Sequence, residues 1–293
     1  MGKLLAVDIG GTYIKYALGD EKYNLLTDTV SQAPSCAEES MPQFLENLRG
    51  IIREMKQKSD LNRACVCIGG PFDFDNGISL MKHKFEALYG QSMKEPFEDE
   101  HVPVTFMHDS TAFMLGEFHD GVLSGTKNAC CVMLGTGLGF AWVKDGRVCL
   151  DASQTPSVKL WSTPYMGGIA EDWVSTRAIQ RYYGQELPVK AIADLARSGD
   201  ERAVSALRTA GEHLSCMMEQ VIKRLGCERM ALGGQIAKSA DLLHLSVPVP
   251  WMCTVRPEEA SLRGMCCYAA MGRDACTQTL TMQFEPLEGS RIA

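Results

Sequence analysis

The chain has 293 residues, of which 45% are hydrophobic and 22% are charged, and its formal net charge is −7 at pH 7. This composition is typical of a globular protein, and the negative charge argues against a dominant nucleic-acid surface. No apolar run is long enough to span a membrane, and the first residues lack a signal-peptide pattern, so we expect a cytoplasmic protein with no nucleic-acid or membrane partner.

The first part of the chain predicts several strands around a glycine turn. The apolar run before Asp8 is typical of a strand buried on both faces, and Gly10, Gly11 and Thr12 follow it as a turn. The other elements predicted in this half are strands over 13–18, 23–30, 63–68 and 102–107, a helix over 38–58, a poorly patterned segment over 80–100 with one helix, and a helix capped by Asp109 or Ser110.

The same order of elements then begins again. An apolar strand over 129–134 leads into the turn Gly135-Thr136-Gly137, and Asp145-Gly146 is a hairpin signal. The other elements predicted here are strands over 138–143, from 147 and over 229–232, and helices over 200–225, near Asp241 and over 257–272. We leave 277–293 as a tail or a helix that returns to the first lobe.

This repetition predicts an α/β protein of two similar lobes, 1–118 and 119–293. Each lobe would be a βββαβαβα unit that presents its glycine turn to a shared central cleft. The twelve cysteines form no Cys-x-x-Cys pair and lie mostly in apolar segments, so we predict buried, reduced thiols.

The first turn has the chemistry of a phosphate site. Without a Cβ, Gly10 and Gly11 allow backbone N–H groups to approach an anion, and Thr12 adds a hydroxyl donor. Asp8 would be repelled by a bare phosphate, so we expect it to hold a hydrated Mg²⁺ that bridges the two. An ordinary tight hairpin with a capping Asp explains the same residues without a ligand, and both explanations stay open from this stretch alone.

Six short motifs occur in order along both lobes. They are Asp8-Ile9-Gly10-Gly11-Thr12, Gly70-Pro71, His108-Asp109-Ser110-Thr111-Ala112, Leu134-Gly135-Thr136-Gly137-Leu138-Gly139, Leu232-Gly233-Gly234 and Leu262-Arg263-Gly264. Together they resemble the actin, hexokinase and Hsp70 superfold and, within it, the ROK family of bacterial sugar kinases and related repressors. The resemblance extends from about Leu4 to Gly272.

The resemblance implies an actin-like ATPase fold and an ATP- and Mg²⁺-dependent kinase that phosphorylates a hydroxyl group of a hexose or amino sugar. It implies phosphate contacts from Gly10, Gly11, Thr12, Gly135, Thr136 and Gly137, and adenosine contacts from Gly233 and Gly234. Asp109 would be the general base, and the sugar contacts would come from Gly70, Pro71, His108, Asp109 and Glu171. Phosphoryl transfer needs mainly positioning and charge neutralisation, and a carboxylate at a helix N-terminus stays ionised to accept a proton.

Two of these residues also have a simpler explanation. Asp109 could be only a helix N-cap, and Glu171 could be a first-turn residue favoured by the helix dipole. The chain also departs from the family pattern. His108 stands where members usually carry Asn, which could change the preferred sugar, and residues 151–179 contain no Cys or His, so we predict no structural zinc site.

The alternatives to a sugar kinase are a non-catalytic nucleotide or sugar sensor of the same fold, and an acetate-kinase-like or ATPase member of the superfold. Family repressors carry a winged helix-turn-helix before the first glycine turn, whereas Asp8 is the eighth residue here, so we expect no direct control of DNA. A homodimer is expected from the resemblance alone.

Overall fold

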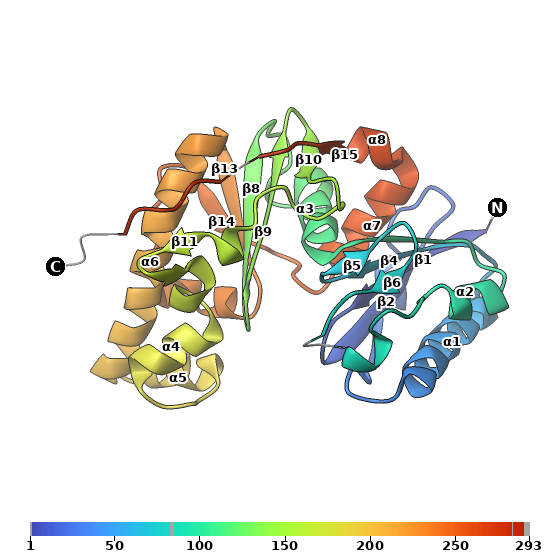
Figure 1. Cartoon of the computed structure of the whole chain (residues 1–293), viewed down its shortest axis with the longest axis horizontal. Helices are drawn as coiled ribbons and strands as arrows, with labels where there is room; N and C mark the ends of the chain where they lie inside the picture. The colour runs from blue at the N-terminus through green and yellow to red at the C-terminus, as the bar shows by residue number, and fades with distance from the viewer. Residues whose placement is uncertain (1, 83–84, 283, 290–293) are drawn as a thin grey trace. The chain divides into compact units, whose positions relative to one another are not determined.

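The structure is a computed structural model of the whole chain, and it describes residues 2–82, 85–282 and 284–289. The chain folds into two compact units (Figure 1). The first unit consists of Met1–Asp120, Arg147–Pro156 and Glu258–Leu280, and the second of Gly121–Gly146, Ser157–Pro257 and Thr281–Ala293. The first unit is therefore assembled from three separated stretches of chain.

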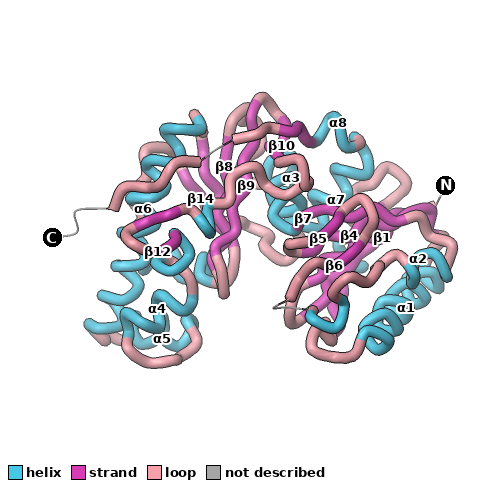
Figure 2. Tube along the Cα trace, viewed as in Figure 1, coloured by secondary structure: helices cyan, strands magenta, loops and turns pink. Residues whose placement is uncertain are grey.

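A five-stranded sheet with the order β3-β2-β1-β4-β7 forms the centre of the first unit (Figure 2). Its strands are β1 (Lys3–Ile9), β2 (Tyr13–Gly19), β3 (Ser31–Pro34), β4 (Leu61–Ile68) and β7 (Val104–His108). β2 pairs antiparallel with β1 and β3, whereas β1, β4 and β7 run parallel. The residues that follow these three parallel strands, Gly10, Gly69 and Asp109, therefore emerge at one edge of the sheet.

Helices and shorter elements complete the first unit. The helices of the first unit are α1 (Met41–Lys58), α2 (Glu95–Asp99), α3 (Asp109–Asp120), α7 (Ala260–Met271) and α8 (Arg273–Cys276). The shorter elements are η1 (Thr27–Thr29), β5 (Phe72–Asp73), β6 (Ile78–Ser79), η2 (Glu86–Leu88), β10 (Arg147–Leu150) and β15 (Thr277–Thr279).

The two faces of the sheet carry different side chains. Alternate residues of β1 beginning at Leu5 belong to the hydrophobic core shared with α1, so Asp8 points to the opposite face. The register pairs Asp8 with Lys15 of β2 and with Cys67 of β4. α7 packs on β1 and β4, and its Ser261 hydrogen-bonds Asp8. Asp8 thus lies on the face of the sheet that α7 covers.

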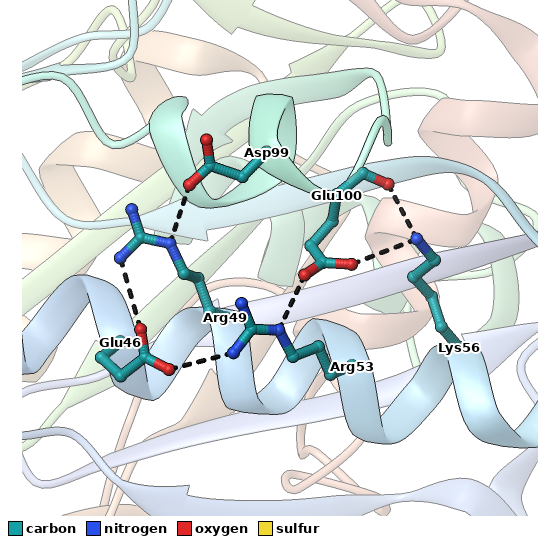
Figure 3. A network of polar contacts seen from close by, with 6 residues as sticks. All are labelled: Glu46, Arg49, Arg53, Lys56, Asp99 and Glu100. Atoms are coloured by element: carbon teal, nitrogen blue, oxygen red, sulfur yellow. Dashed lines mark hydrogen bonds and ion pairs between the residues drawn. The ribbon is translucent and has the colours of Figure 1, made fainter.

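Charged residues on the outer side of α1 connect it to α2 (Figure 3). The Nε of Arg49 donates to Oδ2 of Asp99 at 2.8 Å, and the Nε of Arg53 donates to Oε1 of Glu100 at 2.8 Å. Lys56 also reaches the Glu100 carboxylate, at 3.1 Å. Such surface pairs each contribute little to stability, but as a network they fix α2 immediately before β7.

α3 and α7 cross at small residues. A Cβ at Gly116 of α3 would lie 1.9 Å from the carbonyl oxygen of Ala260, and a Cβ at Gly264 of α7 would lie 1.8 Å from the carbonyl oxygen of Ala112. Neither position has room for a side chain. The close contact brings α7, from the last part of the sequence, onto the helix that begins at Asp109.

The sheet of the second unit has the strand order β14-β13-β8-β9. Its strands are β8 (Ala129–Leu134), β9 (Leu138–Lys144), β13 (Arg229–Gly233) and β14 (Trp251–Cys253). β13 runs parallel to β8 and β14, and β9 runs antiparallel to β8. The parallel strands β8 and β13 end at the same edge, so the turn after β8 and Gly234 after β13 lie near each other.

Three helices pack together in this unit, around the longest helix of the described residues, α6 (Glu201–Leu225). The Asp200 side chain caps its start by accepting from the N–H of Ala203 at 2.8 Å, and Gly226 ends it at a φ of 65°. The other elements of the unit are η3 (Leu160–Ser162), β11 (Pro164–Tyr165), β12 (Gly168–Ile169), η4 (Ala170–Trp173), α4 (Thr176–Tyr183), α5 (Val189–Arg197) and η5 (Ile236–Leu242).

One predicted strand of the first unit is wrong. Residues 23–30 contain an isolated bridge from Leu25 to Gly19 and the 3-10 helix η1, and the third strand comes later, at Ser31–Pro34. Tyr23 has a φ of 63°. The hydroxyl of Thr29 donates to the carbonyl of Leu26 at 2.6 Å and accepts from the N–H of Leu18 at 2.9 Å. These side-chain bonds satisfy backbone groups locally, which the pattern of apolar residues does not reveal.

The chain first leaves the first unit after Asp120, close to the boundary expected at 118/119. A later stretch, Glu258–Leu280, returns to the first unit because α7 packs on α3. Within the tail, β15 is a strand that pairs with β10 rather than a helix. Of the helices that the structure describes, none is both long and apolar enough to cross a lipid bilayer. None of the twelve cysteines, all in described positions, forms a disulfide.

Candidate functional site

The first glycine turn connects β1 to β2. The N–H of Gly10 donates to the carbonyl of Tyr13 at 3.0 Å, and a Cβ at Gly10 would lie 2.9 Å from that oxygen. The carbonyl of Thr12 accepts from the N–H of Ser35, while Gly11 and Thr12 are exposed at the tip. The turn is thus tightly closed at its base and accessible at its tip.

Asp8 lies on β1 directly before this turn. The Sγ of Cys67 donates to its Oδ1 at 3.3 Å. Burial raises the pKa of the Asp8 carboxyl group, and the negative charge of Asp109 raises it further, while Lys15 and the hydrogen bonds from Cys67 and Ser261 oppose this shift. Two carboxylates whose charges repel each other form a suitable environment for a divalent cation, so these residues fit Mg²⁺.

Asp109 stands at the start of α3, and its side chain is 46% exposed. Its Oδ1 accepts from the backbone N–H of Ser110 at 2.5 Å and from the Ser110 hydroxyl at 3.2 Å. A Cβ at Gly69 would lie 3.3 Å from the Asp109 Oδ2. The first turn of the helix therefore orients the carboxylate, and a glycine at the end of β4 leaves space beside it.

His108 ends β7 next to Asp109. Its Nδ1 lies 3.0 Å from Oδ1 of Asp109. The backbone N–H of Ser110 donates to the same Nδ1 at 3.2 Å. The Nε2 of the ring lies 3.7 Å from where a Cβ at Gly70 would be. Gly70 and Pro71, which are joined by a cis peptide bond, thus lie beside both residues.

The second glycine turn connects β8 to β9, and it is closed by the N–H of Gly135 donating to the carbonyl of Gly137 at 3.0 Å. Thr136 is exposed at its tip. A Cβ at Gly234, whose φ is 85°, would lie 2.2 Å from the carbonyl oxygen of Leu134. Gly234, which directly follows Gly233 at the end of β13, therefore packs on the backbone of β8 directly before the turn, and this unit brings together both glycine motifs.

Glu171 lies in η4, and its carboxylate contacts the second glycine turn. Its Oε2 accepts from the N–H of Leu138 at 2.9 Å, and its Oε1 is 3.3 Å from the Arg177 guanidinium. The backbone N–H and the hydroxyl of Thr176 both donate to the carbonyl of Gly135, at 2.9 and 3.0 Å. Sequence reasoning missed Thr176, for which Ser175-Thr176 at a helix start was the only signal.

The predicted site residues thus fall into two groups. The first unit gathers Asp8, Gly10, Gly11, Thr12, Gly70, Pro71, His108 and Asp109 near one edge of its sheet, and the second gathers Gly135, Thr136, Gly137, Glu171, Gly233 and Gly234. Within the described ranges, no group of three or more His, Cys, Asp or Glu side chains could hold a metal ion. Mg²⁺ commonly binds through one or two carboxylates and water, so such a group is not needed for Asp8 to hold a hydrated Mg²⁺.

The strand orders and the glycine turns define an α/β protein of the actin-like superfold. The chain belongs to the ROK family, because the sequence model described as "ROK family" matches residues 4–152 and 164–255.

Curated relatives include proteins of different function. An uncharacterised protein of Clostridium perfringens is 25% identical over 253 residues, covering 83% of this chain and 85% of its own length. An N-acetyl-D-glucosamine kinase of Photobacterium profundum is 26% identical over 271 residues, with coverages of 82% and 86%. The DNA-binding transcriptional repressor Mlc of Escherichia coli is 23% identical, covering 66% of this chain but only 53% of the repressor.

Solved structures share the fold at low sequence identity. A glucokinase of Parabacteroides distasonis aligns with a TM-score of 0.75 and 19% identity, covering 92% of this chain and 97% of the other. A ROK glucokinase of Streptomyces griseus, solved with glucose and AMPPNP, aligns with a TM-score of 0.69 and 18% identity, covering 91% and 98%.

Proposed function

We propose that this protein is an ATP-dependent sugar kinase that transfers the γ-phosphate of ATP to a hydroxyl group of a hexose or amino sugar. The observation that carries the proposal is the half-exposed carboxylate of Asp109, which the first turn of α3 orients at the edge where three parallel strands end. The N-acetyl-D-glucosamine kinase among the relatives and the glucokinases among the solved structures support this class of substrate.

In this reaction Asp109 is the general base. The sugar hydroxyl loses its proton to the Asp109 carboxylate while its oxygen forms a bond to the γ-phosphorus, and the bond from that phosphorus to the ADP oxygen breaks. The N–H and the hydroxyl of Ser110 donate to Oδ1 and thereby fix the carboxylate, which favours a productive geometry. His108 hydrogen-bonds a second sugar hydroxyl, and Gly70-Pro71 bounds the same sugar subsite.

The glycine turns are the proposed nucleotide contacts. Backbone N–H groups of Gly10-Gly11-Thr12 and Gly135-Thr136-Gly137 bind phosphate oxygens, and Gly233-Gly234 packs beside the adenosine. The accessible tips of both turns and the close packing of Gly234 on β8 support these roles. Asp8 would hold Mg²⁺ through water, and the bound ion supplies neutralisation of phosphate charge.

The repressor among the relatives supports a second candidate function, a sugar or nucleotide sensor without catalysis. The two functions differ in one measurable respect, because only the kinase forms ADP when a sugar is present. A homodimer is also proposed, from the resemblance to the family, and the molar mass in solution tests it.

The test of the kinase is an ADP-release assay over a panel of hexoses and amino sugars with ATP and Mg²⁺. General-base catalysis is typically worth about 10²- to 10⁴-fold, so Asp109→Asn is expected to lower kcat by that factor. Asp28→Asn, which changes an exposed carboxylate of the same unit, is the control and should retain full activity. If Asp109→Asn leaves the turnover unchanged, Asp109 is not the general base. Binding of sugar and AMPPNP without phosphorylation would favour the sensor.

A further inference from the structure

Three hydrogen bonds attach the second glycine turn to the segment that joins η4 to α4. They run from the N–H of Leu138 to Glu171, and from the N–H and the hydroxyl of Thr176 to the carbonyl of Gly135. The two bonds from Thr176 hold Gly135, before the tip of the turn, and the bond to Glu171 holds Leu138, after the tip. The partners Glu171 and Thr176 lie more than thirty positions later in the chain, so residues next to the turn do not supply these bonds.

Glycine at position 137 makes the contact with Glu171 possible. A Cβ at Gly137 would lie 2.6 Å from the Oε2 of Glu171, and the next two nearest atoms belong to the same carboxylate. The Glu171 side chain is only 19% exposed, and Arg177 lies 3.3 Å from its other oxygen. The carboxylate is thus placed against the backbone of the turn and has a cationic neighbour that balances its charge.

The Glu171 segment is itself firmly supported. The N–H groups of Val174 and Ser175 donate to the Glu171 carbonyl, and the N–H of Ile169 donates to Oδ2 of Asp172. Arg181 donates to the Asp172 carbonyl at 2.6 Å. Since this segment is anchored on both sides of Glu171, it can serve as a fixed reference for the turn.

We propose that Glu171 and Thr176 are positioning residues for the second glycine turn, and that Glu171 acts on the nucleotide side of the reaction rather than by binding the sugar. This inference rests on the proposed function, in which the turn binds phosphates of ATP. A turn held at both ends presents its N–H groups in one arrangement, so less conformational entropy is lost when phosphate binds.

The test compares matched substitutions at the two residues. Glu171→Gln keeps a side-chain oxygen that can accept from the N–H of Leu138, whereas Glu171→Ala removes the acceptor. Thr176→Ser retains the hydroxyl donor, whereas Thr176→Val removes it and keeps the backbone N–H. Glu186→Ala, an exposed position in the same unit, controls for the loss of one negative charge. Thermal unfolding identifies any variant that fails to fold.

The measurements are the affinity for AMPPNP, the affinity for the sugar with the highest turnover, the KM for ATP, and amide exchange of the peptide containing 135–139. A hydrogen bond to a charged group is worth about 1.5–3 kcal/mol, so Glu171→Ala should weaken AMPPNP binding about tenfold or more. Exchange in the turn should accelerate, sugar affinity should stay within about twofold of the wild type, and Glu171→Gln and Thr176→Ser should largely restore binding.

Several outcomes decide between this inference and the proposed function. A wild type that binds AMPPNP but phosphorylates no sugar refutes the kinase, while weaker AMPPNP binding by Glu171→Ala would still uphold the positioning role. Loss of sugar affinity with unchanged AMPPNP affinity would overturn the inference and assign Glu171 to the sugar. Equal effects of Glu171→Ala and Glu186→Ala, or a wild type that binds no nucleotide, would also overturn it.

Discussion

Gly264 of α7 lies so close to Ala112 of α3 that a methyl group on the glycine would overlap the alanine carbonyl oxygen. The reciprocal contact, between Gly116 and Ala260, has the same character. Ala112 is less than one turn from Asp109, so the contact fixes the start of α3 as well as the crossing of the two helices. The position of the proposed base therefore depends on a residue more than 150 positions later in the chain.

Gly264→Ala is expected to destabilise the protein. Forcing extra atoms into a packed core typically costs about 1–3 kcal/mol, and this clash is with backbone, which cannot rotate away. Gly50→Ala in α1, where no atom lies within 4 Å of the new Cβ, should instead stabilise by roughly 0.5–1 kcal/mol because alanine favours the helix. The free energies of unfolding in urea measure both changes. Equal effects at the two glycines would contradict the tight crossing.

Gly137→Ala and Glu171→Ala are expected to be coupled. The alanine side chain at 137 would first meet the Glu171 carboxylate, so the single substitution Gly137→Ala displaces that carboxylate and destabilises the unit. In the Glu171→Ala background the same substitution should cost much less, with an interaction energy of about 0.5–3 kcal/mol. A double-mutant cycle of unfolding free energies checks this, and simple additivity would mean that the two side chains do not share the space.

Asp8→Asn is expected to stabilise the protein at neutral pH. Because the folded state raises the pKa of Asp8 above its usual value of 3.8, through burial first and Asp109 second, stability falls as the pH rises above that value. The amide carries no charge, so the advantage of the variant should grow from pH 4 to pH 7. Mg²⁺ should raise the Tm of the wild type more than that of Asp8→Asn. Identical Tm values across this pH range would exclude a buried charge at Asp8.

His213 should make the second unit less stable in acid. Its Nδ1 lies 3.1 Å from the Tyr165 hydroxyl, and burial lowers the pKa of the imidazole below its usual value of 6.5. A lowered pKa means that the stabilising contribution is complete above pH 6.5 and is lost as the pH falls below it.

The free energy of unfolding should therefore decline from pH 7 to pH 5 in the wild type and decline less in His213→Gln. Burial also lowers the pKa of His119, in the first unit, so adding His119→Gln should reduce the remaining decline further. Curves with equal slopes in all of these variants would show that neither histidine is buried in its neutral form.

The elements that sequence predicts well are those with their own local signals. The helix predicted over 200–225 is confirmed as α6, because the Asp200 cap and the left-handed Gly226 that delimit it act within one helical turn. The strand over 23–30 was mispredicted because Thr29 bonds locally with its hydroxyl. Periodicity of apolar residues carries no information about such a bond.

Sequence also identified Asp109 and the glycine turns as candidates, through motifs that are contiguous in the chain. It gave no indication that Glu171 and Thr176 contact the second turn, because that contact joins residues separated by more than thirty positions. Likewise, the pairing of Gly264 with Ala112 arises only when α7 returns to the first unit. Tertiary contacts of this kind depend on the complete fold.

The three-part composition of the first unit has a consequence for biosynthesis. A ribosome completes Gly121–Gly146 and Ser157–Pro257 before it releases α7, although the first unit was started earlier. Domains usually fold as units during translation, in order of emergence. Here the later-encoded unit can assemble most of its core while α3 still lacks its covering helix, so the nascent chain exposes the apolar surface of its oldest part until α7 has emerged.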